Sequence, residues 1–149
     1  MRKTRTQSRI LALQMLYQAE ITKDSIHHIQ EYFWQVNDAP ETVKGFANLL
    51  VEGTIEHLTT IDTAIRSAAT HWKIDRMPVV DRCLLRSTTY ELLYLIDIPP
   101  AVSINEAIEL AKKYSTEDSP QFINAILDKI KDMGTEMVSL AELRTSRSE

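Results

Sequence analysis

Four basic side chains stand close together at the start of the chain: Arg2, Lys3, Arg5 and Arg9. On a helix the three arginines are spaced i, i+3 and i+7, so they point roughly the same way. Guanidinium groups on one side of a helix can each bind a phosphate oxygen in forked geometry. The pattern therefore indicates a surface for nucleic acid, although a solvated basic N-terminus would show the same cluster.

Two further places carry side chains that can recognise bases. Tyr17 follows the basic cluster and could stack on an unpaired base, or it could be a core residue with its hydroxyl at the edge. Asp118 and Ser119 stand at an expected helix start, where free amides suit a phosphate but where an N-cap is also common. Asn124, one turn further, could bond a base or a neighbouring loop.

Asp75 and Asp81 flank the expected start of a central helix and are predicted to be exposed there. The helix dipole stabilises carboxylates at such a position without any further role. Exposed carboxylates could also meet a basic partner protein, which makes these two residues candidates for a protein interface.

The residue types of enzymes are present without the spacing that catalysis needs. The four histidines form no zinc-ligand pattern, no serine or cysteine sits in a nucleophile elbow, and no glycine-rich phosphate loop occurs. The single cysteine, Cys83, has an apolar neighbour on one side and is expected to be a small buried side chain. The sequence thus predicts no catalytic residue, no metal site and no cofactor.

The elements that must position these residues are predicted to be helices. Apolar residues recur at three- and four-residue steps, and period-two alternation is too short for a strand. With only three glycines the chain has few hairpin signals. The expected helices cover residues 4–20, 26–36, 41–73 with a break near 59–62, 79–96, 103–114 with a capping box at its start, and 119–133, with Gly134 at the end.

This pattern predicts an all-α fold: a compact bundle of about seven helices. Residues 1–134 are expected to form a single domain with sub-bundles of about 1–73 and 76–134, and residues 135–149 a C-terminal tail of uncertain order.

Charge is unevenly distributed along the chain. Residues 1–19 carry +4, so the remaining residues of a chain with net charge −4 carry −8. A short basic arm on an acidic body again favours a nucleic-acid contact near the N-terminus. No apolar run reaches membrane-spanning length and no signal peptide is apparent, so a cytoplasmic location without a membrane is expected.

Several ordered stretches resemble the NusB family from about residue 5 to residue 130. They include Tyr90-Glu91-Leu92, Asp97-Ile98-Pro99, Ile104-Asn105-Glu106-Ala107-Ile108-Glu109-Leu110-Ala111-Lys112-Lys113, Glu117-Asp118-Ser119 and Phe122-Ile123-Asn124. Two positions depart from the pattern, because many relatives have alanine where Ser8 stands and glycine where Ala125 stands.

The resemblance implies an all-α fold of two packed sub-bundles and a non-enzymatic role in transcription antitermination. It implies binding of boxA-type single-stranded RNA together with NusE, a small-subunit ribosomal protein, in a complex that keeps RNA polymerase elongating, notably on ribosomal RNA operons. Some relatives also form a homodimer. The implied RNA contacts are Arg2, Lys3, Arg5, Arg9, Tyr17, Asp118, Phe122 and Asn124, and the implied NusE contacts are Asp75 and Asp81.

With about three to four phosphates neutralised, single-strand binding should have a log–log salt slope of roughly −2 to −3. Two other functions fit parts of the sequence. An RNA-modifying enzyme with this fold at its N-terminus is disfavoured, because no glycine-rich cofactor loop follows. A helical protein–protein scaffold with weak or no RNA binding stays open, because the arginine set is small.

Overall fold

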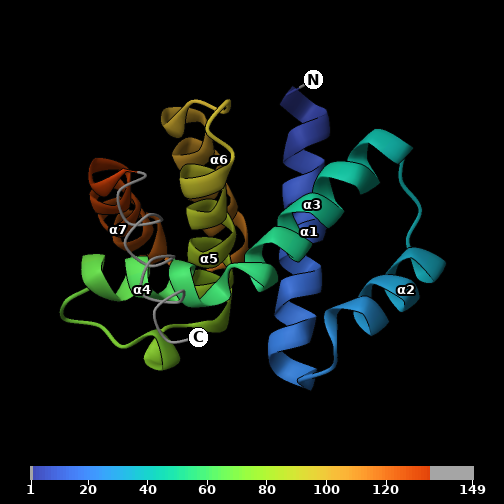
Figure 1. Ribbon diagram of the computed structural model, residues 1–149, viewed down its shortest axis with the longest axis horizontal. Helices are drawn as coiled ribbons and strands as arrows, with labels where there is room; N and C mark the ends of the chain where they lie inside the picture. The colour runs from blue at the N-terminus through green and yellow to red at the C-terminus, as the bar shows by residue number, and fades with distance from the viewer. Residues whose placement is uncertain (1, 135–149) are drawn as a thin grey trace, which may run out of the picture. The chain divides into compact units, whose positions relative to one another are not determined.

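The computed structural model describes residues 2–134 of the chain, with side chains from Lys3 onward. This part contains seven α-helices, one 3-10 turn and no strand, which confirms the all-α prediction (Figure 1). The elements are α1 (Arg2–Thr22), α2 (Ile26–Val36), α3 (Glu41–Glu56), α4 (Leu58–Ala68), η1 (Ile74–Arg76), α5 (Val79–Tyr94), α6 (Pro100–Tyr114) and α7 (Ser119–Met133). No helix in this range is long and apolar enough to cross a membrane.

The helices form two compact units, divided between Glu56 and His57. The sequence placed this boundary later, between residues 73 and 76. The difference arises because α4 packs against α5 and α7, so it belongs with the second unit although it follows α3 after a single residue.

The first unit consists of α1, α2 and α3, with α1 packed against both of the others. Its core is formed by the apolar stripe of each helix, including Leu16 of α1, Phe33 of α2 and Leu50 of α3. Ser25 caps the second helix, since its hydroxyl accepts a hydrogen bond from the backbone N–H of His28 at 3.3 Å.

The second unit is built around α5, which packs against α4, α6 and α7. The core of this unit also contains buried polar side chains. The Arg86 guanidinium donates to both carboxylate oxygens of Asp62, at 2.9 and 3.0 Å, and joins α5 to α4. Cys83 is buried, as predicted.

Two local predictions about helix starts were wrong. The break after α3 lies at His57 rather than at residues 59–62. Ser103 does not open a helix, because α6 already begins at Pro100, whose missing N–H suits a first turn. Inside the helix the Ser103 hydroxyl donates instead to the Glu91 carboxylate at 2.8 Å, which ties α6 to α5.

The last helix ends as the sequence predicted. Gly134 caps α7 with φ 61° and ψ −159°, a combination that is essentially restricted to glycine. The tail expected at residues 135–149 lies outside the described residues.

Candidate nucleic-acid interface

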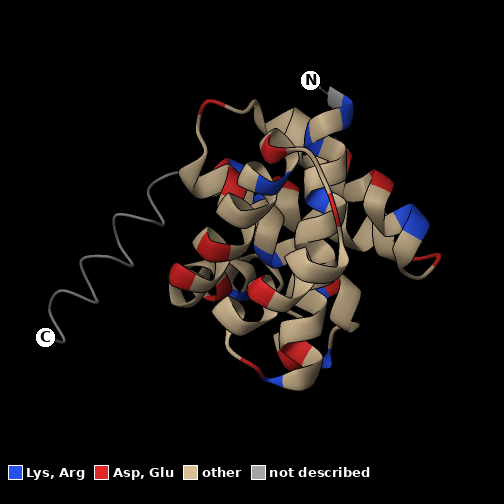
Figure 2. Cartoon of the chain, turned by 90° about the vertical axis from the view of Figure 1, so that its right-hand side faces the viewer, with Lys and Arg blue, Asp and Glu red and all other residues tan. Residues whose placement is uncertain are grey.

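The basic start of α1 is held against an aromatic ring of α3. The Arg5 guanidinium carbon lies 3.9 Å from the centre of the Phe46 ring, and that of Arg9 lies 5.6 Å from the same centre. Arg5 and Arg9 therefore point to one side of α1, as their spacing predicted. Figure 2 shows the basic positions gathered near the N-terminus of the chain.

Exposure separates the basic residues into two groups. Lys3 and Arg5 are exposed, whereas Arg9 is only 6% exposed. A guanidinium above a ring face is attracted by the ring's negative potential and keeps its outer N–H groups free for a second partner. Arg5 thus presents a pre-positioned cation to solvent, while Arg9 contributes mainly to the packing beneath it. Arg2 begins α1, ahead of the side chains that the structure describes.

Ser8 holds the two helices of this arrangement together. Its hydroxyl is fully buried and lies 2.9 Å from the backbone oxygen of Val43 in α3, and it also lies 3.1 Å from the Thr4 oxygen one turn earlier. The departure from the family's usual alanine therefore adds a polar link between α1 and α3. This link fixes the helix that carries Arg5 relative to the Phe46 ring.

Tyr17 is 42% exposed, so the core alternative for this side chain does not hold. It lies about two turns along α1 from Arg9. A tyrosine with an open ring on the same helix as a cationic cluster has the geometry for stacking on an unpaired base.

The start of α7 supplies a second group of predicted residues. Asp118 occupies the N-cap position, is exposed and makes no side-chain capping bond. The Ser119 hydroxyl makes the hydrogen bonds of this loop instead. It accepts from the Thr116 N–H at 3.2 Å and donates to the Asp81 carboxylate at 2.9 Å. The Asp118 carboxylate is therefore not committed to capping its own helix.

Asp81 is not exposed, and the prediction of its exposure was wrong. The residue is only 2% exposed and accepts hydrogen bonds from the hydroxyls of both Ser115 and Ser119. Its position in the first turn of α5 turns the carboxylate toward the loop between α6 and α7, which a sequence pattern along α5 could not reveal. Asp75, in η1, is exposed as predicted.

Phe122 and Asn124 follow in the first turns of α7. Asn124 is exposed, and so is Ala125, the second departure from the family pattern. Phe122 is partly buried and meets Trp72 edge-to-face, with ring centres 5.4 Å apart and an interplanar angle of 78°. Trp72 falls within the helix expected over residues 41–73, yet it lies in the loop after α4 and is 60% exposed.

The predicted RNA-binding residues thus fall into two groups, one in each unit. Lys3, Arg5, Arg9 and Tyr17 belong to the first unit, and Asp118, Phe122 and Asn124 belong to the second. Within the described residues, no group of three or more His, Cys, Asp or Glu side chains is arranged to hold a metal ion.

Comparison with known proteins gives consistent matches along the chain. The model of the NusB family matches residues 6–132. The transcription antitermination protein NusB of Thermodesulfovibrio yellowstonii is 44% identical over 136 residues, covering 85% of this chain and 90% of the relative. The protein of the same name from Geobacter sulfurreducens is 48% identical over 123 residues, covering 82% and 89%.

Solved structures match the fold as well. NusB from T. maritima has a TM-score of 0.80 at 36% identity, covering 91% of this chain and 96% of that one. A crystal structure of the antitermination factors NusB and NusE in complex with double-stranded RNA has a TM-score of 0.81 at 26% identity, covering 89% and 99%.

Proposed function

Because the chain belongs to the NusB family, whose model matches nearly all of residues 2–134, we propose that it is a non-enzymatic RNA-binding factor of transcription antitermination. The observation that carries the proposal is the exposed Arg5 guanidinium, held over Phe46 beside exposed Lys3. A cationic group that is pre-positioned in this way loses little conformational entropy when it binds a phosphate.

The RNA ligand in this proposal is single-stranded and of the boxA type. Lys3 and Arg5, with Arg2, neutralise phosphates, and Arg9 supports them from its buried position beside Phe46. Tyr17 stacks on a base, and Asp118, Phe122 and Asn124 contact bases from the second unit. Sequence preference comes from these base contacts, because phosphate contacts carry no sequence information.

NusE is the proposed protein partner, in line with the solved NusB–NusE complex among the structural neighbours. Exposed Asp75 offers a carboxylate for this contact. Asp81, which is buried, serves the interface by fixing the loop before α7 instead of touching the partner. We further propose that the RNA-bound pair joins cytoplasmic elongating RNA polymerase, notably on ribosomal RNA operons, and that free protein also forms a homodimer.

Titration of a boxA RNA tests the proposal, with a scrambled RNA and an RNA duplex as competitors, each with and without NusE and at several salt concentrations. The expected result is selective binding to the single strand, tightened by NusE. The slope of log affinity against log salt should be about −2, because single-strand binding contributes about 0.7 for each neutralised phosphate.

A matched pair of variants locates the contact. Arg5→Gln removes a charge from the exposed cluster, whereas Lys23→Gln removes one near the other end of α1. Arg5→Gln should weaken RNA binding and lower the salt slope by about 0.7, while Lys23→Gln should change neither. Binding of NusE without any preference for boxA over scrambled RNA would support the alternative of a protein–protein scaffold.

A further inference from the structure

Trp72 presents a large aromatic surface to solvent from a fixed position. It lies in the loop between α4 and η1, and its backbone N–H donates to the Ala69 oxygen at 3.2 Å. Its indole is 60% exposed but meets the Phe122 ring edge-to-face. The contact with Phe122 restrains the ring, and the exposed fraction of 60% leaves most of Trp72 open to solvent.

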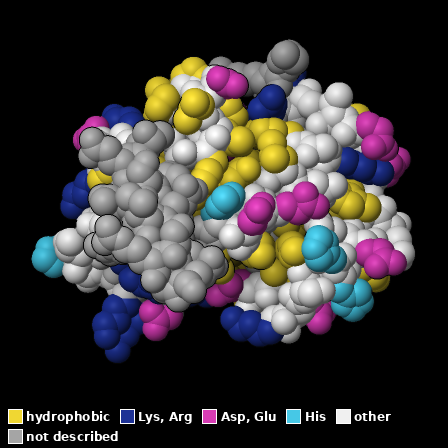
Figure 3. All heavy atoms as spheres, viewed as in Figure 1, with side chains coloured by type: hydrophobic (Ala, Val, Ile, Leu, Met, Phe, Trp, Pro, Cys, Tyr) yellow, Lys and Arg dark blue, Asp and Glu magenta, His cyan; other side chains and the backbone are white. Residues whose placement is uncertain are grey.

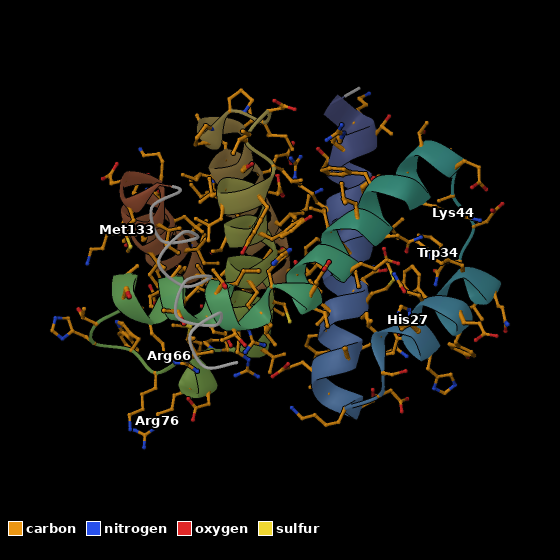
Figure 4. All side chains as sticks on the ribbon, viewed as in Figure 1. His27, Trp34, Lys44, Arg66, Arg76 and Met133 are labelled. Carbon is orange, nitrogen blue, oxygen red and sulfur yellow. The ribbon has the colours of Figure 1, made fainter. Side chains whose placement is uncertain are left out.

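Three cationic side chains lie within six residues of Trp72 in the sequence. Lys73 follows Trp72 directly, Arg76 ends η1, and Arg66 lies in the last turn of α4. All three are exposed, and none forms an ion pair with another residue in the range 2–134. Figure 4 shows Arg66 and Arg76 extending from the same side of the α4–η1 region, and Lys and Arg side chains project from that edge in Figure 3.

The charge around Trp72 favours a polyanionic ligand. Residues 66–76 contain three basic side chains and one acidic one, Asp75, in a chain whose net charge is −4. Proteins that bind single-stranded nucleic acid combine a cationic track for the backbone with aromatic rings on which bases stack. An exposed indole that follows Arg66 and precedes Lys73 and Arg76 in the sequence has both parts of this combination.

We propose that Trp72 is a base-stacking platform for single-stranded RNA, flanked by Arg66, Lys73 and Arg76 as phosphate contacts. This inference rests on the proposed RNA-binding function and extends it to a residue outside the contacts expected from the family. Phe122 then acts as a positioning residue, because its ring packs nearly perpendicular to the indole. The Trp72 indole provides the stacking surface.

Intrinsic fluorescence tests the stacking directly, because the chain contains only two tryptophans. Trp34 is partly buried, and its indole N–H donates to the Asn48 side chain at 2.9 Å. In a Trp34→Phe variant the emission reports on Trp72 alone. Addition of unlabelled boxA RNA should quench it, whereas the Trp72→Phe protein, which retains Trp34, should show little quenching. Should Trp34→Phe fail to fold, the difference between wild-type and Trp72→Phe titrations gives the same quantity.

Binding affinities test whether the stack matters. Trp72→Leu should weaken RNA binding about tenfold, since one base–aromatic stack contributes about 1–3 kcal/mol, and Trp72→Phe should weaken it less. Ile96→Ala is the matched control: Ile96 is 72% exposed in the same unit but lies in the loop after α5, at the end of that helix opposite Asp81. Its affinity should stay within about twofold of wild type.

Three outcomes would overturn the inference. In the first, RNA binds in an Arg5-dependent manner while Trp72 emission and the affinity of Trp72→Leu stay unchanged. This result refutes the stacking role of Trp72 and leaves the proposed function intact. Quenching by NusE alone, with loss of NusE binding in Trp72→Leu but not of RNA binding, identifies a protein interface instead. Absence of any RNA binding by the wild-type protein, with or without NusE, refutes the proposed function together with this inference.

Discussion

Replacement of Asp81 by alanine should destabilise the second unit strongly, although this residue stands where a surface contact was expected. Its carboxylate is 2% exposed and accepts from the Ser115 and Ser119 hydroxyls. A hydrogen bond to a charged group contributes about 1.5–3 kcal/mol. Part of this loss is recovered, because the hydroxyls left by Asp81 can still bond to one another. The Ser119 hydroxyl lies 3.0 Å from that of Ser115 and 2.7 Å from that of Thr116.

The expected loss in the free energy of unfolding is therefore about 3 kcal/mol for Asp81→Ala, and about half of that for Asp81→Asn, which keeps one acceptor oxygen. With a urea dependence of about 2 kcal/mol per molar, the midpoint of unfolding should fall by about 1.5 M in the alanine variant. Far-UV circular dichroism during urea titration measures this shift.

A double-mutant cycle with Ser119→Ala isolates the contact. The two single changes should couple by about 1–2 kcal/mol, because each removes one partner of the same buried bond. Asp81→Asn should also lower RNA affinity without changing the salt slope, since no phosphate contact is lost. Two results would refute the buried network and indicate an exposed Asp81 carboxylate. One is an Asp81→Ala protein as stable as wild type; the other is that the free-energy losses of the two single variants add to that of the double variant within about 0.5 kcal/mol.

Three further changes test other parts of the structure. Arg9→Gln, unlike Arg5→Gln, should lower the midpoint of thermal unfolding by several degrees because Arg9 is buried; equal midpoints for the two variants would contradict this difference. Arg86→Ala should cost about 3–5 kcal/mol in urea unfolding, because it leaves the Asp62 carboxylate buried without its bidentate partner, and a loss below about 1 kcal/mol would show that water replaces the bridge. Gly134→Ala should cost about 1–3 kcal/mol from backbone strain, since among residues 2–134 no atom other than those of its chain neighbours and its own helix backbone lies within 4 Å of the added carbon; unchanged stability would mean that the α7 terminus rearranges freely.

Local sequence signals predicted most of the fold. The periodicity of apolar residues placed the helices, and Gly134 marked an end that the structure confirms. The Ser103 capping box failed because the same serine–glutamate spacing occurs inside a helix whose start was already set by Pro100. A helix start therefore depends on which competing cap comes first in the chain, and the motif alone does not decide it.

The candidate site was harder to predict, since exposure depends on tertiary packing. The spacing of Arg5 and Arg9 gave their common direction, but only the position of Phe46 on α3 determines that Arg9 is covered. Likewise, nothing in the segment around Asp81 indicates that Ser115 and Ser119 will reach it from another part of the chain. The opposite error concerns Trp72, which was expected within the helix of residues 41–73 but lies in a loop and is exposed.

The order of the helices bears on how the chain folds during its own synthesis. The Arg5–Phe46 contact and the Ser8–Val43 hydrogen bond need only residues of the first unit, which ends at Glu56. Domains generally fold N-terminal part first as they leave the ribosome. We therefore expect Arg5 to be positioned over Phe46 on the nascent chain while the second unit is still being translated. Protease resistance of residues 1–56 on stalled ribosomes would reveal this early folding, and equal sensitivity until release would exclude it.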